Sequence, residues 1–156
     1  MMEEDSSYEN AKRRALRFLA YRPRSVFEIR TKLASLGFGA STVAKVIDRF
    51  SELGYLDDEN VARQWALNYA RNRLWGNMKI AAQLRKLGIP ERAIEGAIAE
   101  ARREIGEKKA IEKIIEKRFP DRLTSHKISA KEKQRLVRHL IGKGFAPGAV
   151  YEILEG

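Results

Sequence analysis

Three segments of the chain share one spacing of apolar residues around a glycine, and this repeat constrains the fold more than any other feature. The glycines are Gly37, Gly88 and Gly144. In each segment a leucine lies four residues before the glycine, and apolar residues follow the glycine at offsets of one, six and ten. The glycines lie roughly 50 residues apart, which is a period typical of helical repeat proteins.

This spacing predicts a helix, a glycine turn and a second helix. The leucine lies one turn before the end of the first helix, and glycine adopts the left-handed position after that end at low steric cost. The apolar residue after the glycine can fold back onto the helix, as in a Schellman ending. The two later apolar positions lie one turn apart on one face of the next helix.

A further helix precedes this pair in each unit. Residues 10–21 of the first unit place Ala11, Ala15 and Phe18 on one face, and Pro23 ends the pattern. No segment alternates apolar and polar residues with the period of two that is typical of a strand. We therefore predict an all-α protein of three tandem three-helix repeats, stacked into an elongated and curved array.

Helix-start and helix-stop signals set the limits of the units. Ser25 with Glu28, and Ser129 with Glu132, have the spacing of capping boxes, so each pair predicts the start of a helix. Residues 1–9 are polar and acidic, and we expect a disordered tail there. The predicted repeats are residues 10–56, 57–104 and 105–156.

The composition excludes several classes of chemistry. The chain has no cysteine, which excludes disulfides, thiolate nucleophiles and cysteine-ligated metals. Its two histidines, His126 and His139, have no carboxylate at the spacing of a metal site, and no glycine-rich phosphate loop is present. We therefore predict no catalytic residues, no metal, no cofactor and no enzymatic activity.

The start of the chain bears on its location. It is acidic and lacks the apolar region of a signal peptide. No apolar run in the sequence approaches the ~20 residues that a membrane-spanning helix needs. We expect a cytoplasmic monomer that has no membrane partner.

The charge is strongly basic, with 31 Lys and Arg against 21 Asp and Glu. The basic residues gather in one window per repeat, over residues 10–27, 60–90 and 122–151, and most acids lie between the windows. If the repeats stack in register, the windows form one strip, which favours an anionic partner. Ordinary solvated helix faces would give the same pattern. The candidate contacts to DNA phosphates or an acidic protein surface are Arg22, Arg24, Arg71, Arg73, Lys79, Lys133, Arg135, Arg138 and Lys143.

Three aromatic residues lie in the middle window: Trp65, Tyr69 and Trp75. Such rings can stack on nucleic-acid bases, but their spacing suits packing in a helical core equally well. Trp75 lies next to Gly76 and the basic residues, so it is the most favourable of the three positions for an exposed ring.

The first unit by itself also matches a helix-turn-helix. In that interpretation the helix that begins near Ser41 enters the major groove, where Lys45 and Arg49 would contact bases. Asp48 and Glu52 on the same helix make it a poor recognition helix. A stand-alone helix-turn-helix DNA-binding regulator stays open as the alternative function.

Several motifs occur in a specific order along the chain: Arg22-Pro-Arg-Ser-Val-Phe-Glu28, Gly54-Tyr-Leu-Asp-Asp58, the segment 71–76, Gly88-Ile89, and Lys143-Gly-Phe145. In this order they resemble the RecX family of regulatory proteins, and the resemblance covers nearly the whole chain. One departure is Gln83, where members of that family often carry an acid.

The resemblance implies a fold of three tandem three-helix repeats and a specific partner. RecX proteins bind the RecA recombinase filament on single-stranded DNA and inhibit its strand exchange, ATP hydrolysis and coprotease activity. The resemblance therefore implies a role in modulating DNA repair and the SOS response. It also implies that the elongated body lies in the filament groove, and that DNA is bound without sequence specificity.

Overall fold

The structure is a computed structural model that describes residues 2–120 and 128–155. These ranges contain helices and no strands, which confirms the all-α prediction. The helices are α1 (Met2–Tyr21), α2 (Val26–Ser35), α3 (Ala40–Glu52), α4 (Asp58–Arg71), α5 (Asn77–Lys86), α6 (Glu91–Glu104), α7 (Glu107–Arg118), α8 (Ala130–Gly142) and α9 (Pro147–Glu155).

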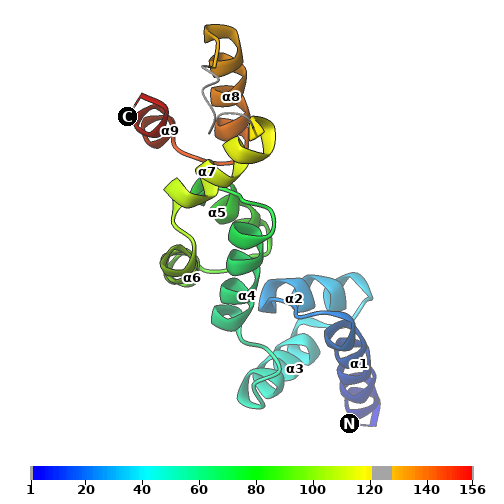
Figure 1. Cartoon of the computed structure of the whole chain (residues 1–156). Coiled ribbons are helices and arrows are strands. Elements are labelled where there is room, and N and C mark those ends of the chain that lie inside the picture. Colours follow the sequence, from blue (N-terminus) through cyan, green and yellow to red (C-terminus); the bar gives the residue numbers. More distant parts are fainter. Residues whose placement is uncertain (1, 121–127, 156) are drawn as a thin grey trace.

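The helices follow one another along an elongated body (Figure 1). The group α1–α3 forms one end, α4–α6 the middle and α7–α9 the other end, and the two termini lie at opposite ends of the molecule. The predicted repeat boundaries fall between α3 and α4 and between α6 and α7. The elongated helical array is therefore confirmed.

The repeated glycine turns have one geometry. Gly37, Gly88 and Gly144 have φ values of +92°, +72° and +100°. In each turn the N–H of the next residue donates to the carbonyl oxygen of the leucine four residues before the glycine, at 3.2 Å. That bond defines a Schellman ending. The three leucines are fully buried, so the repeat in the sequence marks both the turn and the core beneath it.

The first helix begins earlier than the sequence predicts. The structure shows residues 2–9 as part of α1, where we expected a disordered tail. Tyr8 packs against the core of the first repeat, and the ammonium group of Lys12 lies 5.3 Å from the centre of its ring. Tyr8 thus lengthens the buried face of α1 by about a turn beyond the predicted start at residue 10.

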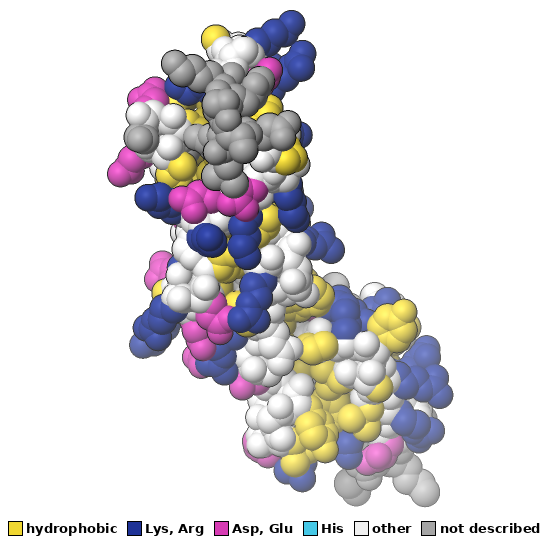
Figure 2. Space-filling view, in the orientation of Figure 1, with side chains coloured by type: hydrophobic (Ala, Val, Ile, Leu, Met, Phe, Trp, Pro, Cys, Tyr) yellow, Lys and Arg dark blue, Asp and Glu magenta, His cyan; other side chains and the backbone are white. Residues whose placement is uncertain are grey.

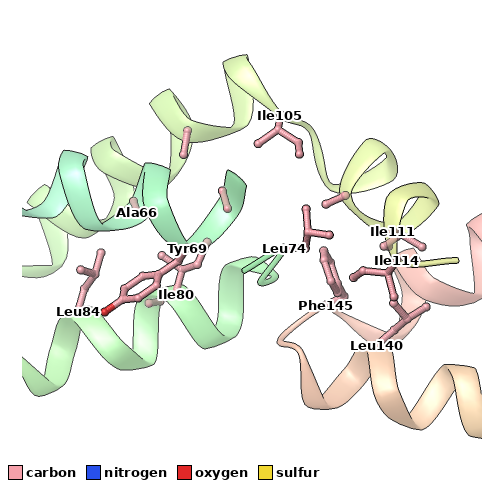
Figure 3. Close-up of a cluster of buried hydrophobic side chains, with 14 of the residues drawn as sticks. Ala66, Tyr69, Leu74, Ile80, Leu84, Ile105, Ile111, Ile114, Leu140 and Phe145 are labelled. Atoms are coloured by element: carbon pink, nitrogen blue, oxygen red, sulfur yellow. The ribbon is translucent and has the colours of Figure 1, made fainter. Parts of the chain in front are cut away.

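The buried side chains form two separate clusters. One belongs to the first repeat and includes Leu33 and Phe50. The other runs without interruption from the second repeat into the third. Figure 3 shows this shared cluster, in which Leu74 of the second repeat lies beside Phe145 of the third. The second and third repeats therefore share one core, while the first repeat has its own.

The two junctions between repeats use equivalent positions. Ser25 is the N-cap of α2 and Gly76 is the N-cap of α5. At the first junction the Ser25 hydroxyl donates to the carbonyl oxygen of Leu87. At the second, the N–H of Gly76 donates to the carbonyl oxygen of Lys143 at 2.8 Å. Leu87 and Lys143 each precede a repeat glycine, so the glycine turn of one repeat lies on the second helix of the repeat before it.

Close approach at these junctions requires glycine. A Cβ atom on Gly88 would overlap the side chain of Phe27, and one on Gly76 would overlap the backbone of Gly144. Gly37 occupies the equivalent turn of the first repeat, and among the described residues nothing lies within 4 Å of a Cβ built there. The difference follows from the packing, because the Gly88 and Gly144 turns each lie on another described repeat and the Gly37 turn does not.

Candidate anion-binding site

Arg22 and Arg24 lie at the first junction and are engaged there. Their guanidinium groups lie 2.5 and 3.5 Å from the Glu28 carboxylate, and the Arg24 Nε donates to the carbonyl oxygen of Phe18. The Glu28 carboxylate also accepts from the N–H of Ser25, which completes the predicted capping box. The two arginines therefore hold the start of α2, and Glu28 neutralises part of their charge.

Arg71 also has an acidic partner. It forms an ion pair with Glu104, which links the end of α4 to the end of α6. Both side chains are exposed, and exposed pairs contribute little to the free energy of unfolding. The pair mainly reduces the positive charge that Arg71 presents to solvent.

Three of the predicted residues come together at the second junction: Arg73, Lys79 and Lys143. The Lys143 ammonium donates to the carbonyl oxygen of Arg73 at 2.8 Å. The Arg73 guanidinium and the Lys79 ammonium lie 5.4 and 4.5 Å from the centre of the Trp75 ring. The three cations therefore approach one another around the Trp75 side chain.

Trp75 is not an open platform for stacking. It is half-buried, and its ring stacks on Tyr69 with the ring centres 4.3 Å apart. Tyr69 also stacks on Trp65, so the three aromatic residues form a ladder on the second repeat. The ladder supports the core and positions the cations of Arg73 and Lys79 by cation–π contacts.

A pocket of about 370 Å³ lies at this junction, between the second and third repeats. Three titratable residues that are not among the predicted contacts also line it: Lys117, Arg118 and His139. Its lining residues are Asn72, Arg73, Leu74, Trp75, Ile114, Lys117, Arg118, His139 and Lys143. No Asp or Glu is among them.

The pocket lies where three helices end. Asn72 is the C-cap of α4, Arg118 is the last residue of α7 and Lys143 is the C-cap of α8. Free carbonyl groups at a helix C-terminus interact favourably with cations. This arrangement explains how the fold tolerates several cations so close together.

Burial and neighbouring positive charges both act on the titratable side chains of the pocket. Burial, followed by the charges of Arg118, Lys143 and Lys79, lowers the pKa of His139. Burial, followed by the charges of Lys79, Lys117 and Arg73, lowers the pKa of Lys143. Each of these effects disfavours another positive charge.

The remaining predicted residues lie on α8. Arg135 and Arg138 are exposed and Lys133 is half-buried, and none of them lines the pocket. Other basic residues of the third window, Arg122 and Lys127, lie outside the described residues, as does His126. On the face shown in Figure 2, basic side chains occur along the length of the molecule, with Asp and Glu among them.

The described residues contain no group of three or more His, Asp or Glu side chains that could hold a metal ion. Within the same ranges, no helix has both the length and the apolar character needed to cross a membrane.

Comparisons with known proteins decide the family. The family models described as "RecX, first three-helix domain" and "RecX, second three-helix domain" match residues 11–50 and 57–98. The regulatory protein RecX of Mycolicibacterium smegmatis is 31% identical over 148 residues, which cover 94% of this chain and 79% of that protein. The chain belongs to the RecX family. The resemblance seen in the sequence is thus confirmed.

Other RecX proteins extend the comparison to the third repeat. The regulatory protein RecX of Thermus thermophilus is 35% identical over 138 residues, which cover 88% of this chain and 85% of that protein. The crystal structure of RecX from Lactobacillus salivarius matches with a TM-score of 0.84 at 21% identity, over 97% of this chain and 96% of that one. A crystal structure of regulatory protein RecX matches with a TM-score of 0.80 at 23% identity, over 98% of this chain and 73% of that one. Both structures support the fold of the whole array.

Proposed function

We propose that this RecX-family chain binds the RecA recombinase filament on single-stranded DNA and inhibits its recombination, ATPase and coprotease activities. The observation that carries the proposal is the match to regulatory proteins of the RecX family over nearly all of this chain, in fold as well as sequence. Through this inhibition the protein would modulate DNA repair and the SOS response.

The mechanism that fits the fold is occupation of the filament groove. An elongated array of repeats presents an extended surface, so it can contact several successive subunits of a filament at once. Contacts on successive subunits would hinder the movements that accompany ATP hydrolysis and strand exchange. The protein would act in the cytoplasm as a monomer, without a cofactor and without catalysing a reaction.

Basic residues would supply the contacts to DNA phosphates or to acidic protein surface. The cluster at the second junction, with Arg73, Lys79 and Lys143, has the strongest support because its charge is not offset by acids in the pocket lining. Arg135 and Arg138 are exposed on α8 and are further candidates. Arg22 and Arg24 would contribute less, since both pair with Glu28.

The helix-turn-helix alternative has weaker support. The helix that would enter the major groove is α3, and on it Arg49 forms an exposed ion pair with Glu52 at 3.4 Å. A recognition helix needs such side chains free to contact base edges. With Arg49 engaged in this pair and Asp48 on the same helix, α3 is a poor reader of duplex DNA.

A titration of recombinase ATPase activity tests the proposal. Increasing amounts of this protein are added to RecA filaments on single-stranded DNA at about 150 mM salt, and binding to the filaments is measured by co-sedimentation. We expect binding together with a progressive fall in the hydrolysis rate. An unchanged rate without co-sedimentation, combined with tight sequence-specific binding to bare duplex DNA, would favour the helix-turn-helix alternative instead.

A further inference from the structure

The pocket at the second junction is built by both of the repeats that meet there. Arg73 and Trp75 come from the linker between α4 and α5 in the second repeat. Lys117 and Arg118 come from the last turn of α7, and Lys143 follows α8, in the third repeat. The pocket therefore exists only while the third repeat is docked on the second.

We propose that this pocket binds the phosphate groups of a nucleic-acid backbone, and that a bound backbone clamps the third repeat onto the second. This inference rests on the proposed contact between the second-junction cluster and DNA phosphates, and it adds the remaining pocket residues and the clamp. It is tested on the isolated chain, without the recombinase.

The first support is the concentration of like charge. Four Lys and Arg residues and one His line the pocket, and they come from three separate segments of the chain. Their mutual repulsion opposes folding, since each cation disfavours its neighbours. Burial is the larger cause of the lowered pKa values of His139 and Lys143, and neighbouring positive charges lower both further. A phosphate group in the pocket would convert the repulsion into attraction.

Helix capping alone does not explain the pocket. A cation that caps a helix needs only to lie near the end of its own helix. Here the cations from different helices surround a common hollow of about 370 Å³. Capping requires no such convergence, whereas binding an anion does.

The donor groups match a phosphate ester. Arg73 and Arg118 bring guanidinium groups, whose forked donors fit phosphate oxygens, and Lys117 and Lys143 bring compact point charges. The Trp75 ring is already stacked on Tyr69, so the proposed binding does not include base stacking on this ring. Recognition would then depend on the backbone and not on base sequence.

The clamp follows from the position of the pocket. Two backbone bonds cross the junction beside the shared apolar core: Gly76 N–H to the Lys143 carbonyl oxygen at 2.8 Å, and Met78 N–H to the Gly144 carbonyl oxygen at 3.0 Å. The cation of Arg73 lies on one side of this junction, and those of Lys117 and Arg118 lie on the other. An anion that contacts both sides stabilises the docked arrangement by its binding free energy.

The test uses the full chain with Trp65→Phe, so that Trp75 is the remaining tryptophan and reports on the pocket. Fluorescence is titrated with single-stranded oligothymidylate at about 100 mM salt. The double variant Lys117→Gln, Arg118→Gln removes two cations that are exposed and lie outside the core. The matched control is Lys108→Gln, Lys109→Gln, which removes the same charge from exposed positions of the same helix away from the pocket lining.

We expect saturable binding that weakens about 10-fold or more in the double variant and less than about 3-fold in the control. Equal weakening in the two variants would show that net charge alone matters and would overturn the assignment of the pocket. Inorganic phosphate at the same concentration should not reproduce the change in Trp75 fluorescence. If inorganic phosphate bound as tightly as the oligonucleotide, the assignment of the pocket to a nucleic-acid backbone would be overturned. Tighter binding of polyglutamate than of the oligonucleotide would overturn it in favour of an acidic protein.

Amide hydrogen exchange tests the clamp. We expect the oligonucleotide to slow exchange at the N–H groups of Gly76 and Met78, which form the junction bonds. The N–H of Phe38, in the equivalent turn of the first repeat, is the internal control and should not change. Binding without slower exchange at Gly76 and Met78 would refute the clamp. Neither measurement contains the recombinase, so a negative result in either one would refute this inference without refuting the proposed inhibition of the recombinase.

Discussion

The N–H of Gly76 donates to the carbonyl oxygen of Lys143, and at the equivalent positions of the first junction the hydroxyl of Ser25 donates to the carbonyl oxygen of Leu87. One contact is therefore used twice, with a backbone donor in one case and a side-chain donor in the other. The array therefore repeats the junction between neighbouring units as well as the three-helix unit itself.

Replacing Ser25 tests the first junction. The side chain is fully buried; it accepts from the N–H of Glu28 at 3.1 Å and donates to Leu87. Ser25→Ala removes the helix cap and leaves the Leu87 carbonyl without this donor, so we expect the free energy of unfolding to fall by about 2 kcal/mol. Urea denaturation followed by circular dichroism measures the change. Ser41→Ala, at an exposed site on α3, should cost less than about 0.5 kcal/mol, and similar costs at both sites would contradict the prediction.

The repeated glycines provide a matched comparison. Gly37→Ala and Gly144→Ala both place a side chain at a positive φ, which costs about 1–2 kcal/mol. Only at Gly144 would the new Cβ also overlap a neighbour, the backbone and side chain of Lys79. We expect Gly144→Ala to lower the free energy of unfolding by about 1–3 kcal/mol more than Gly37→Ala. Equal thermal shifts for the two variants would show that the second junction relaxes freely.

The two separate cores predict two separable units of stability. Phe50→Ala opens a cavity in the first repeat and should cost about 3–5 kcal/mol. Hydrogen exchange should then accelerate in α1–α3 far more than in α4–α9. Leu84→Ala, in the shared core, should instead accelerate exchange throughout the second and third repeats. Uniform acceleration in either variant would mean that the chain unfolds as one unit.

His139 makes stability and binding depend on pH. Its pKa in the folded protein is lowered from the usual 6.5, so the unfolded chain binds more protons between the two values. Stability should therefore decrease as the pH falls below about 6.5, and His139→Gln should reduce this decrease. Denaturation midpoints between about pH 5 and pH 7.5 measure the effect.

An anion in the pocket would act on His139 in the opposite direction. It would raise the pKa of the imidazole and offset the charges of Arg118, Lys143 and Lys79. Oligonucleotide binding should therefore strengthen as the pH falls towards 6, and less so in His139→Gln. If the unaltered protein and the His139→Gln variant showed the same pH dependence of oligonucleotide binding, His139 would not face the bound anion.

The sequence predicts the repeat unit well because its signals are local. A leucine, a glycine and the next apolar residue specify a Schellman ending within six residues. Ser25 with Glu28 specifies a helix start in the same way. The early start of α1 was missed because Tyr8 is the only large apolar side chain among residues 6–9, and its burial depends on the tertiary packing of the first repeat.

The candidate site was predicted in part because its formation depends on how the repeats dock. Lys117 and Arg118 directly follow Glu116, so they lie outside the basic windows of the sequence. Arg22 and Arg24 lie in an acid-free window that ends at residue 27, one position before the Glu28 that pairs with both. Charge windows along the chain thus indicate composition, but they do not show which charges meet in space.

The division of the core has a mechanical consequence. The second and third repeats share continuous apolar packing, whereas the first repeat is held to the second by side-chain contacts such as those of Ser25 and Phe27 and by the bond from the N–H of Val26 to Asp58 at 2.9 Å. We expect tension along the molecule to separate the first repeat from the second before it opens the shared core. If a filament bound both ends of the protein and pulled them apart, the contacts between the first and second repeats would break first.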